Sequence, residues 1–495
     1  MQHPLPLNQE NLSQISSKVG CPTYDRSRLA TGIVHVGVGG FHRSHEAVYT
    51  DQLLQSGDDL RWGICGVGLR ESDRKMQAIL QEQDYLYTLI VKHPDGTIEA
   101  KVIGSLVDFL IGPDNPKAVI ERMAAPETHI VSLTITEGGY NVDPATGDFD
   151  TSNPDAQYDI QNPMQPRLVF GYLVAALKMR RERGLPALTI QSCDNIQHNG
   201  DLTRKMVVGY AHLLDADLAH WIDKNTSFPN AMVDRITPVT AKSDIEFLQK
   251  QYGVHDQWPV TCEPFSQWVI EDQFSDDRPN WQDVGAQFVP DVSPYETMKL
   301  RLLNAGHSVL GIPGAIYGLD TIDACMSDER FASFLRGFFD IEAVPVLGDV
   351  EGIDLDQYKN TLMERFGNPN ISDQLSRICS QSSSKLPVFL IPTIRENLSR
   401  DGSIRYGTLV IAAWCYYCEM HADQQGQPLE VIDEMKAALH QAAKGTSDDP
   451  LAFIKFKPVF GDLADNDRFA TTFTELVKKV YESPDITQLM QEMNS

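Results

Sequence analysis

The sequence predicts a two-domain protein of the α/β class, with a parallel-sheet N-terminal domain carrying insertions and a mainly α-helical C-terminal domain. The chain has 495 residues. A single hydrophobic core stops growing at roughly 250–300 residues, so two domains are expected. Residues 1–290 alternate short apolar runs with helical spacing, whereas residues 291–495 show helical spacing throughout. We therefore predict domains over 1–290 and 291–495.

The expected elements of the N-terminal domain follow from short apolar runs and the segments between them. Strands are expected at residues 32–38, 61–69, 87–93, 128–136, 187–194 and 232–239. Helical spacing lies between them, for example at 43–56, 73–83 and 164–183. Residues 95–110 resemble an added hairpin and strand. Residues 139–166 are rich in Asp, Asn, Pro and Gly, which predicts a long loop or insertion.

The charge and the absence of targeting signals restrict the partners. The net charge is -26, and this field repels nucleic acid and anionic membranes. The start of the chain lacks the basic and apolar regions of a secretory signal. The apolar run at 407–418 is shorter than the ~20 residues of a membrane span. We expect a cytoplasmic protein with small-molecule ligands, as a monomer or a small homo-oligomer.

Cysteines and histidines give no metal signature. The eight cysteines are scattered, and only Cys415 and Cys418 form a close pair. That pair lies in an apolar helical run, which favours buried core cysteines over zinc or redox chemistry. His35, His42 and His45 are near in sequence but span a strand, a turn and a helix start. We predict no metal site.

The segment Gly37-Val-Gly39-Gly40-Phe41-His42 predicts a dinucleotide-binding turn. Such a turn must follow a strand and open a helix, as in the Rossmann-type fold, and this segment satisfies both conditions. Gly37 permits the tight turn, while Gly39 and Gly40 let backbone amides approach a pyrophosphate. His42 occupies the third glycine position, and we expect it to loosen the packing of helix on strand. An ordinary glycine loop is the alternative.

An acidic residue at the end of the second strand should select the cofactor. Asp59 precedes that strand, so the candidates are Glu71 and Asp73. A carboxylate there accepts the ribose 2′-hydroxyl and repels a 2′-phosphate, which favours NAD. Arg70 is the opposing feature, since an arginine there would bind the 2′-phosphate of NADP.

Residues 295–311 carry the most informative polar pattern. At ~100° per residue, with Lys299 at zero, Glu296 falls near ~60°, His307 near ~80° and Asn304 near ~140° on a helix. A desolvated lysine can act as general base, and an asparagine amide can stabilise an alkoxide. His307 would orient a hydroxyl, and Glu296 would relay the proton. The alternative is a hydrogen-bonded structural network.

Two further polar residues end predicted strands. Asn195 follows the strand at 187–194, and Glu137 follows the strand at 128–136. The carboxyl edge of such a sheet faces the ligand crevice. Turn capping is the alternative role for each residue.

Four segments together resemble the polyol-specific long-chain dehydrogenases. These are residues 32–54, S-F-P-N-A-M-V-D-R-I-T-P at 227–238, K-L-R-L-L-N-A-G-H-S-V-L-G at 299–311 and V-F-G-D-L-A-D-N-D-R-F at 459–469. The resemblance extends over about residues 28–480. It implies zinc-independent, NAD(P)-dependent interconversion of a sugar alcohol and a ketose, at a site between a Rossmann-type domain and a helical domain.

The resemblance also implies roles for individual residues. Lys299 would be the general base, and Asn195 with Asn304 would form the oxyanion hole. Glu296 and Glu137 would line a proton route, and Asp73 would disfavour a 2′-phosphate. The polyol pocket would be formed by His307, Asp234, Arg377 and Lys385. D-Mannitol and D-fructose are the expected pair. A D-arabinitol dehydrogenase and a fructuronate or tagaturonate reductase are the alternatives, the latter with Arg377 or Lys385 binding a carboxylate.

Overall fold

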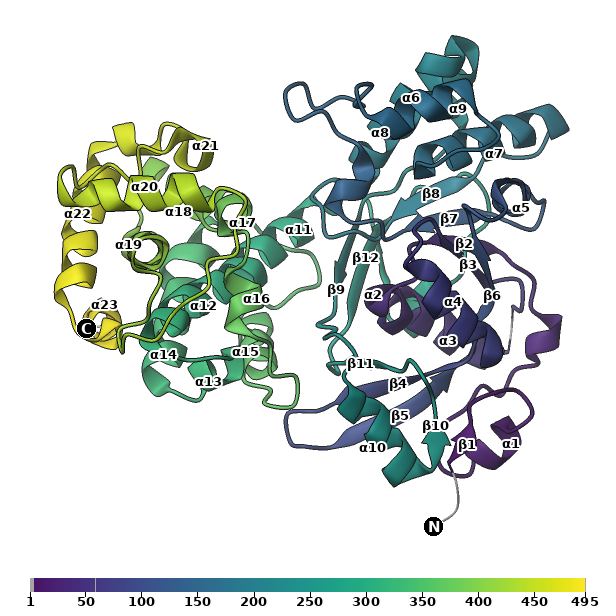
Figure 1. Cartoon of the computed structure of the whole chain (residues 1–495), viewed down its shortest axis with the longest axis horizontal. Coiled ribbons are helices and arrows are strands. Elements are labelled where there is room, and N and C mark those ends of the chain that lie inside the picture. The colour runs from purple at the N-terminus through teal and green to yellow at the C-terminus, as the bar shows by residue number, and fades with distance from the viewer. Residues whose placement is uncertain (1–3, 58, 495) are drawn as a thin grey trace. The chain divides into compact units, whose positions relative to one another are not determined.

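The computed structural model describes residues 4–57 and 59–494 and divides the chain into two compact units (Figure 1). Unit 1 comprises Met1–His93 and Thr97–Ser293, and unit 2 comprises Pro94–Gly96 and Pro294–Ser495. Within the described ranges, every helix is too short or too polar to cross a membrane.

Unit 1 is built on a five-stranded parallel sheet. Its strands are β2 (Ile33–Val36), β3 (Ile64–Gly68), β6 (Leu106–Ile111), β7 (Ile130–Leu133) and β8 (Thr189–Ser192). They lie in the order β6-β3-β2-β7-β8, and every neighbouring pair is parallel. Numbered along the chain, this is the 3-2-1-4-5 order of a doubly wound, Rossmann-type sheet. The predicted class of the N-terminal domain is confirmed.

Both faces of this sheet are buried, each in its own core. Val34 and Val36 of β2 pack with α5 (Pro116–Met123), α7 (Val169–Arg183) and α8 (Asn199–Leu214). Ile33, on the opposite face, joins a core that includes α3 (Glu46–Gln55). Successive side chains of a strand alternate between faces, so His35 faces the α3 side.

Two three-stranded sheets and a short strand pair complete unit 1. One sheet contains β11 (Val260–Cys262), β4 (Tyr87–Lys92) and β5 (Ile98–Ile103), and the other contains β13 (Gln287–Val289), β12 (Gln267–Glu271) and β9 (Ala231–Asp234). The pair is β1 (Leu5–Pro6) with β10 (Val254–His255). The strands after residue 253 were not predicted, because runs of two to five residues carry little periodicity.

The remaining α-helices of unit 1 follow the turns and loops between the strands. They are α1 (Leu12–Ile15), α2 (Gly40–Ser44), α4 (Asp73–Glu82), α6 (Pro154–Gln161), α9 (Ala216–Asn225) and α10 (Lys242–Tyr252). Helix α6 lies inside the segment predicted as a loop. Pro154 stands in its first turn, where proline is tolerated, and the Asn153 side chain accepts from the amide of Asp155.

Unit 2 is mainly helical, as predicted. After α11 (Ser293–Lys299) and α12 (Ala305–Tyr317) its helices are α13 (Ile322–Met326), α14 (Glu329–Phe338), α15 (Leu355–Phe366), α16 (Leu375–Cys379), α17 (Ser382–Phe389), α18 (Ile391–Ser399), α19 (Arg405–Met420), α20 (Lys436–Lys444), α21 (Lys457–Phe460), α22 (Asp467–Glu482) and α23 (Ile486–Asn494). Cys415 and Cys418 lie in α19 and are buried, as expected. Burial raises the pKa of the Cys415 thiol to about 12, so it stays protonated.

Candidate active site

The glycine turn lies at the point where the strand order of the main sheet reverses. Gly37 follows β2, and Thr134 follows the neighbouring strand β7. In open α/β sheets, ligands bind outside the carboxyl ends of the strands at this switch point. The topology therefore places the predicted dinucleotide turn where a ligand crevice is expected.

Gly37 is required by the protein's own packing. Its φ is +99°, and a Cβ here would lie 2.2 Å from the carbonyl oxygen of Thr134. The Thr134 hydroxyl also donates to the carbonyl oxygen of Gly37 at 2.7 Å. Because only glycine combines this conformation with such a close approach, the turn is tied to the end of β7.

Gly39 and Gly40 are not required by the protein in the same way. The backbone of Gly39 is extended, with φ -130° and ψ -170°, which any residue can adopt. A Cβ on Gly39 would approach protein atoms no closer than 3.7 Å, and one on Gly40 no closer than 3.5 Å. A Cβ at either position would make only ordinary van der Waals contacts, so the need for glycine is better explained by the close approach of a cofactor's pyrophosphate to the backbone.

The segment after the turn forms two helices where one was expected over 43–56. Helix α2 ends at Ser44 and α3 begins at Glu46, because His45 has φ -121° and ψ -96°. The Nε2 of His45 donates to the carbonyl oxygen of Gln267 at 3.0 Å. The Phe41 ring stacks on the His45 ring with 4.9 Å between centroids. A tertiary hydrogen bond thus overrides the local helical spacing at His45.

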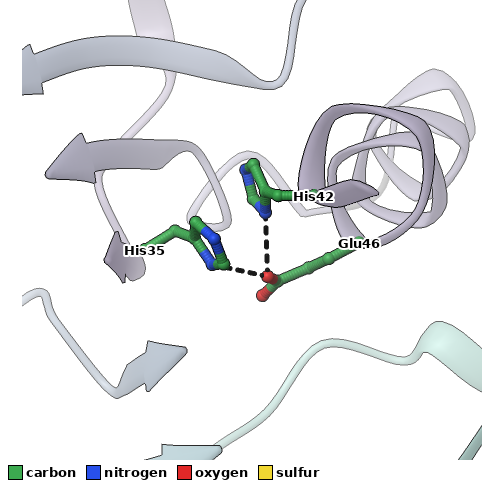
Figure 2. Close-up of side chains that lie close together, drawn as sticks. All are labelled: His35, His42 and Glu46. Carbon is green, nitrogen blue, oxygen red and sulfur yellow. Dashed lines mark hydrogen bonds and ion pairs between the residues drawn. The ribbon is translucent and has the colours of Figure 1, made fainter. Parts of the chain in front are cut away.

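His42 does not loosen the packing of helix on strand, contrary to expectation. Its ring stacks on the His35 ring of β2, with the centroids 3.5 Å apart and the planes at 14°. Both side chains point toward Glu46 (Figure 2), and all three are at most 1% exposed. The imidazole pair fills the space that a third glycine would leave. His45 lies outside this cluster.

The V-D-R-I-x-P element holds the end of α2. Arg235 donates from Nη1 to the carbonyl oxygen of Ser44 at 2.7 Å, and its Nη2 donates to the carbonyl oxygen of Glu263 at 3.0 Å. The hydroxyls of Ser44 and Thr237 lie 2.7 Å apart. Asp234 ends β9 and is 5% exposed. The sequence assigned a role only to Asp234 and missed the structural roles of Arg235 and Thr237.

Asp73 is the acid that faces the end of β3. It begins α4, its side chain is 16% exposed, and it accepts from the amide of Arg70 at 2.9 Å. By contrast, the Glu71 side chain is 81% exposed and forms an ion pair with Arg74. The Arg70 side chain is 76% exposed. Of the two acids that the sequence offered, the geometry favours Asp73.

Asn195 and Glu137 lie at the carboxyl edge of the sheet, both exposed. The loop that carries Glu137 is strained at Thr136, where φ is +63°, a rare conformation for a β-branched residue. Asp194 holds it there by accepting from the amides of Thr136 at 2.8 Å and Ile135 at 3.1 Å. Strain that surrounding contacts maintain is typical of functional loops.

In unit 2, four predicted residues lie on one continuous helical segment that contains a π-helical turn. Glu296 and Lys299 lie on α11 and are 4% and 7% exposed. Leu300–Asn304 is π-helical, with the Ala305 amide donating to the Leu300 carbonyl. The uniform 100° projection is therefore wrong beyond Lys299, because a π turn holds more residues than an α turn. Such turns occur frequently at functional sites.

Asn304 ends the π turn, and His307 follows it on α12. The Oδ1 of Asn304 is buried and has no hydrogen-bond partner within the described ranges. His307, on α12, has its ring 4.4 Å from the Phe366 ring. A buried carbonyl oxygen without a donor is costly unless a ligand satisfies it, so the Oδ1 of Asn304 is suited to accept a hydrogen bond from a ligand hydroxyl.

Arg377 and Lys385 are brought together by α16 and α17. The Nζ of Lys385 donates to the carbonyl oxygens of Arg377 at 3.4 Å and Ile378 at 3.1 Å. Arg377 donates two hydrogen bonds, one of them at 2.7 Å, to the carboxylate of Asp373, which lies four residues earlier in the chain. The guanidinium is thus already neutralised by a carboxylate of the protein.

Comparisons with known proteins match the chain over nearly its full length. Residues 31–283 match the family model for the mannitol dehydrogenase Rossmann domain, and residues 291–481 match that for the mannitol dehydrogenase C-terminal domain. Mannitol 2-dehydrogenase of Aspergillus fumigatus is 45% identical over 488 residues, which cover 96% of this chain and 97% of that protein. Mannitol 2-dehydrogenase of Pyricularia oryzae is 43% identical, with 94% of each chain covered.

Two solved structures resemble the chain over its whole length. The ternary complex of Pseudomonas fluorescens mannitol 2-dehydrogenase with NAD and D-mannitol is 41% identical, with a TM-score of 0.87 and 99% of each chain covered. A substrate-free D-sorbitol dehydrogenase is 36% identical, with a TM-score of 0.91, covering 99% of this chain and 100% of its own.

The two kinds of glycine in the turn should respond differently to a methyl group. Gly37→Ala should lower the free energy of unfolding by about 1–3 kcal/mol or more, because of its positive φ and the Thr134 carbonyl. Gly39→Ala should lower it by less than about 1 kcal/mol, since the protein leaves room for the methyl. Urea unfolding of both variants measures the difference. Equal losses would contradict the assignment of Gly39 to a ligand.

Proposed function

The chain belongs to the mannitol dehydrogenase family, and we propose that it interconverts D-mannitol and D-fructose with NAD. The coarser activity follows from the family and from the whole-length relatives: the protein is an NAD-dependent polyol dehydrogenase. The observation that carries the finer proposal is the 41% identity, over 99% of both chains, to an enzyme solved with NAD and D-mannitol.

The cofactor is assigned to the first domain. We place the dinucleotide-binding domain at 1–290 and the substrate-binding and catalytic domain at 291–495. Gly37, Gly39, Gly40 and Phe41 form the turn that would hold the pyrophosphate. Asp73 would accept the ribose hydroxyls, because its carboxylate faces the end of β3. Bound NAD supplies the acceptor for the hydride.

Residues of the chain itself would remove the proton of the substrate hydroxyl and stabilise the alkoxide. Lys299 takes the proton of the substrate hydroxyl as the hydride leaves the same carbon. Asn195 and Asn304 donate hydrogen bonds to the oxygen as its negative charge develops. The carbonyl of the ketose then forms without a metal ion as the Lewis acid.

The remaining polar residues would carry the proton to water and bind the other substrate hydroxyls. Glu296 lies one helical turn from Lys299 and would pass the proton toward water, together with Glu137. Asp234 and His307 would hold substrate hydroxyls, with Arg377 and Lys385 at the pocket. Each of these residues has a side chain suited to hydrogen bonds with a polyol.

The state of Arg377 favours a polyol over a uronate or aldonate. A carboxylate substrate is bound best by a guanidinium that is free to make two parallel hydrogen bonds. Arg377 already makes such bonds to Asp373. The Asp373 carboxylate would therefore compete with a substrate carboxylate for this guanidinium and weaken its binding. D-Sorbitol is a second candidate substrate, because a D-sorbitol dehydrogenase resembles the whole chain with a TM-score of 0.91.

A substrate panel tests the proposal. Nicotinamide absorbance would be followed at mildly alkaline pH with NAD and D-mannitol, D-arabinitol, D-sorbitol, D-mannonate or D-altronate, each with and without a strong metal chelator. We expect the highest kcat/KM for D-mannitol, with no loss in the chelator. A preference for D-sorbitol or D-arabinitol would change the substrate and keep the chemistry. A preference for an aldonate would make Arg377 or Lys385 a carboxylate site.

Replacing the proposed base should abolish turnover without removing the cofactor. Lys299→Ala should lower kcat for D-mannitol by roughly 100- to 10,000-fold, the usual contribution of a general base, while NADH binding persists. The control is Lys359→Ala, another buried lysine of unit 2, paired there with Asp340 and Asp356. It should lower stability but keep the kcat of the folded enzyme. A near-normal rate for Lys299→Ala would contradict its role.

Cofactor choice should depend on Asp73. Asp73→Ala should raise the ratio of kcat/KM for NADP to kcat/KM for NAD by roughly tenfold or more, a change of about 1.4 kcal/mol. The carboxylate would no longer repel the 2′-phosphate. Glu71→Ala is the matched control, since Glu71 is exposed and paired with Arg74, and it should leave the ratio unchanged. A shift only in the Glu71 variant would move the ribose contact there.

A further inference from the structure

A cluster of polar side chains lies in the core beneath the glycine turn (Figure 2). His35 comes from β2, His42 from α2 and Glu46 from α3. The Oε2 atom of Glu46 lies 3.0 Å from the Nδ1 of His35 and 3.2 Å from the Nδ1 of His42. The Ser132 hydroxyl donates to the same oxygen at 2.9 Å. One carboxylate oxygen therefore joins a strand, its neighbour and both helices that follow the turn.

The position of the cluster is set by the strand register. His35 of β2 lies directly opposite Ser132 of β7, and both face the side of the sheet that α3 covers. Neighbouring positions on that face, such as Ile33 and Ile130, are apolar and fully buried. Replacing buried charged groups by apolar residues is often neutral or stabilising. Stability alone therefore does not explain this cluster.

The first link from the cluster to the turn runs through His35. Its Nε2 lies 2.9 Å from the Thr134 hydroxyl oxygen, and that hydroxyl donates to the carbonyl of Gly37 at 2.7 Å. A hydroxyl takes part in more than one hydrogen bond, so the Thr134 hydroxyl bridges the His35 ring and the Gly37 carbonyl. Glu46 sets the orientation of His35. The His35 ring in turn positions the Thr134 hydroxyl, which holds the carbonyl of Gly37 at the start of the turn.

The second link runs through His42, at the other end of the turn. Burial lowers the pKa of His42 to about 4, so the ring is neutral at neutral pH. Burial alone would raise the pKa of the Glu46 carboxyl, but its hydrogen bonds to His35 and His42 outweigh burial and hold that pKa well below its usual range. The ionised Glu46 therefore accepts a hydrogen bond from the Nδ1–H group of His42.

The ring geometry disfavours a metal ion at these three residues, although their ligand atoms lie within 4.8 Å of one another. The His35 and His42 rings are nearly parallel, with centroids 3.5 Å apart. An ion between the two rings would lie out of both ring planes. The nitrogen lone pairs lie in the ring planes and would not point at it.

We propose that Glu46 is a positioning residue for the dinucleotide, which sets the shape of the Gly37–His42 turn through His35 and His42. This inference rests on the proposed use of NAD at that turn. None of the three side chains needs to touch the cofactor. Their effect would be on the affinity for the dinucleotide, whereas the chemical step depends on Lys299 and the asparagines.

The first test separates affinity from turnover in Glu46→Gln, which keeps the shape and removes the charge. The dissociation constant of NADH, measured by its fluorescence on binding, and the KM for NAD should each rise at least about tenfold. The kcat at saturating NAD should stay within about threefold of wild type. An unchanged dissociation constant, or a fall in kcat with an unchanged KM, would overturn the proposal.

Glu342→Gln is the matched control for this variant. Glu342 is a fully buried carboxylate of unit 2 that accepts from the amides of Tyr406 and Gly407 and from the Ser403 hydroxyl. Its replacement removes a carboxyl group at the same burial and should leave NADH affinity unchanged. An equal loss of affinity in this control would show that the effect of Glu46→Gln is general destabilisation, and would overturn the proposal.

A pair of substitutions at His42 tests the cluster independently, including the case in which Glu46→Gln fails to fold. His42→Gly restores the third glycine of the ordinary fingerprint, and His42→Asn keeps an N–H close to the position of Nδ1. We expect His42→Gly to weaken NADH binding at least about tenfold and His42→Asn to recover most of it. If His42→Gly bound NADH as well as wild type, His42 would be only a tolerated substitution.

Two controls on the wild-type enzyme distinguish failure of the positioning role from failure of the proposed NAD-dependent function. If the wild type bound no NADH, the proposed function itself would fail, whereas normal binding with unaffected variants would overturn only the positioning role. Metal analysis of the purified protein completes the test. A stoichiometric transition metal lost in His42→Gly would make the cluster a metal centre and overturn the proposal.

Discussion

The contact between Gly37 and Thr134 is the constraint on which unit 1 depends. At the switch point of the sheet, the backbone of the turn approaches the carbonyl of the neighbouring strand so closely that a single Cβ would collide with it. The Thr134 hydroxyl bonds back to Gly37, so the turn cannot move without the end of β7. The packing of the protein does not itself require glycine at Gly39 and Gly40, the two positions proposed to face the pyrophosphate.

The five residues after Phe41 anchor the turn in the interior of unit 1. His42, Arg43, Ser44, His45 and Glu46 are all buried, and several parts of unit 1 hold them. Arg43 donates to the carbonyl of Trp258, and the Tyr87 hydroxyl donates to that of Arg43. A buried polar segment with many specific partners has fewer alternative arrangements than an apolar one. Such a segment gives a cofactor site a defined shape before the cofactor binds.

Unit 2 uses a different device to place its functional groups. A π turn at Leu300–Asn304 interrupts the helix between Lys299 and His307, and it changes which side chains share a face. Glu296 and Lys299, one turn apart, are both nearly buried, which keeps the proposed base and its proton relay close together. Arg377, one of the residues proposed for the pocket, already pairs with Asp373 of the same unit.

The sequence by itself determined the fold class, the strand-turn-helix around Gly37, the candidate Asp73 and the K-x-x-x-x-N-x-x-H segment, because these depend on local spacing and on residue types with few alternative uses. Periodicity could not reveal the break at His45, the π turn after Lys299 or the short strands after residue 253. The break at His45 and the short strands depend on hydrogen bonds to distant residues. Only the tertiary structure decided that His35, Ser132 and Glu46 meet. A polar residue in an apolar strand shows that a partner is needed, and strand register and helix packing decide which residue supplies it.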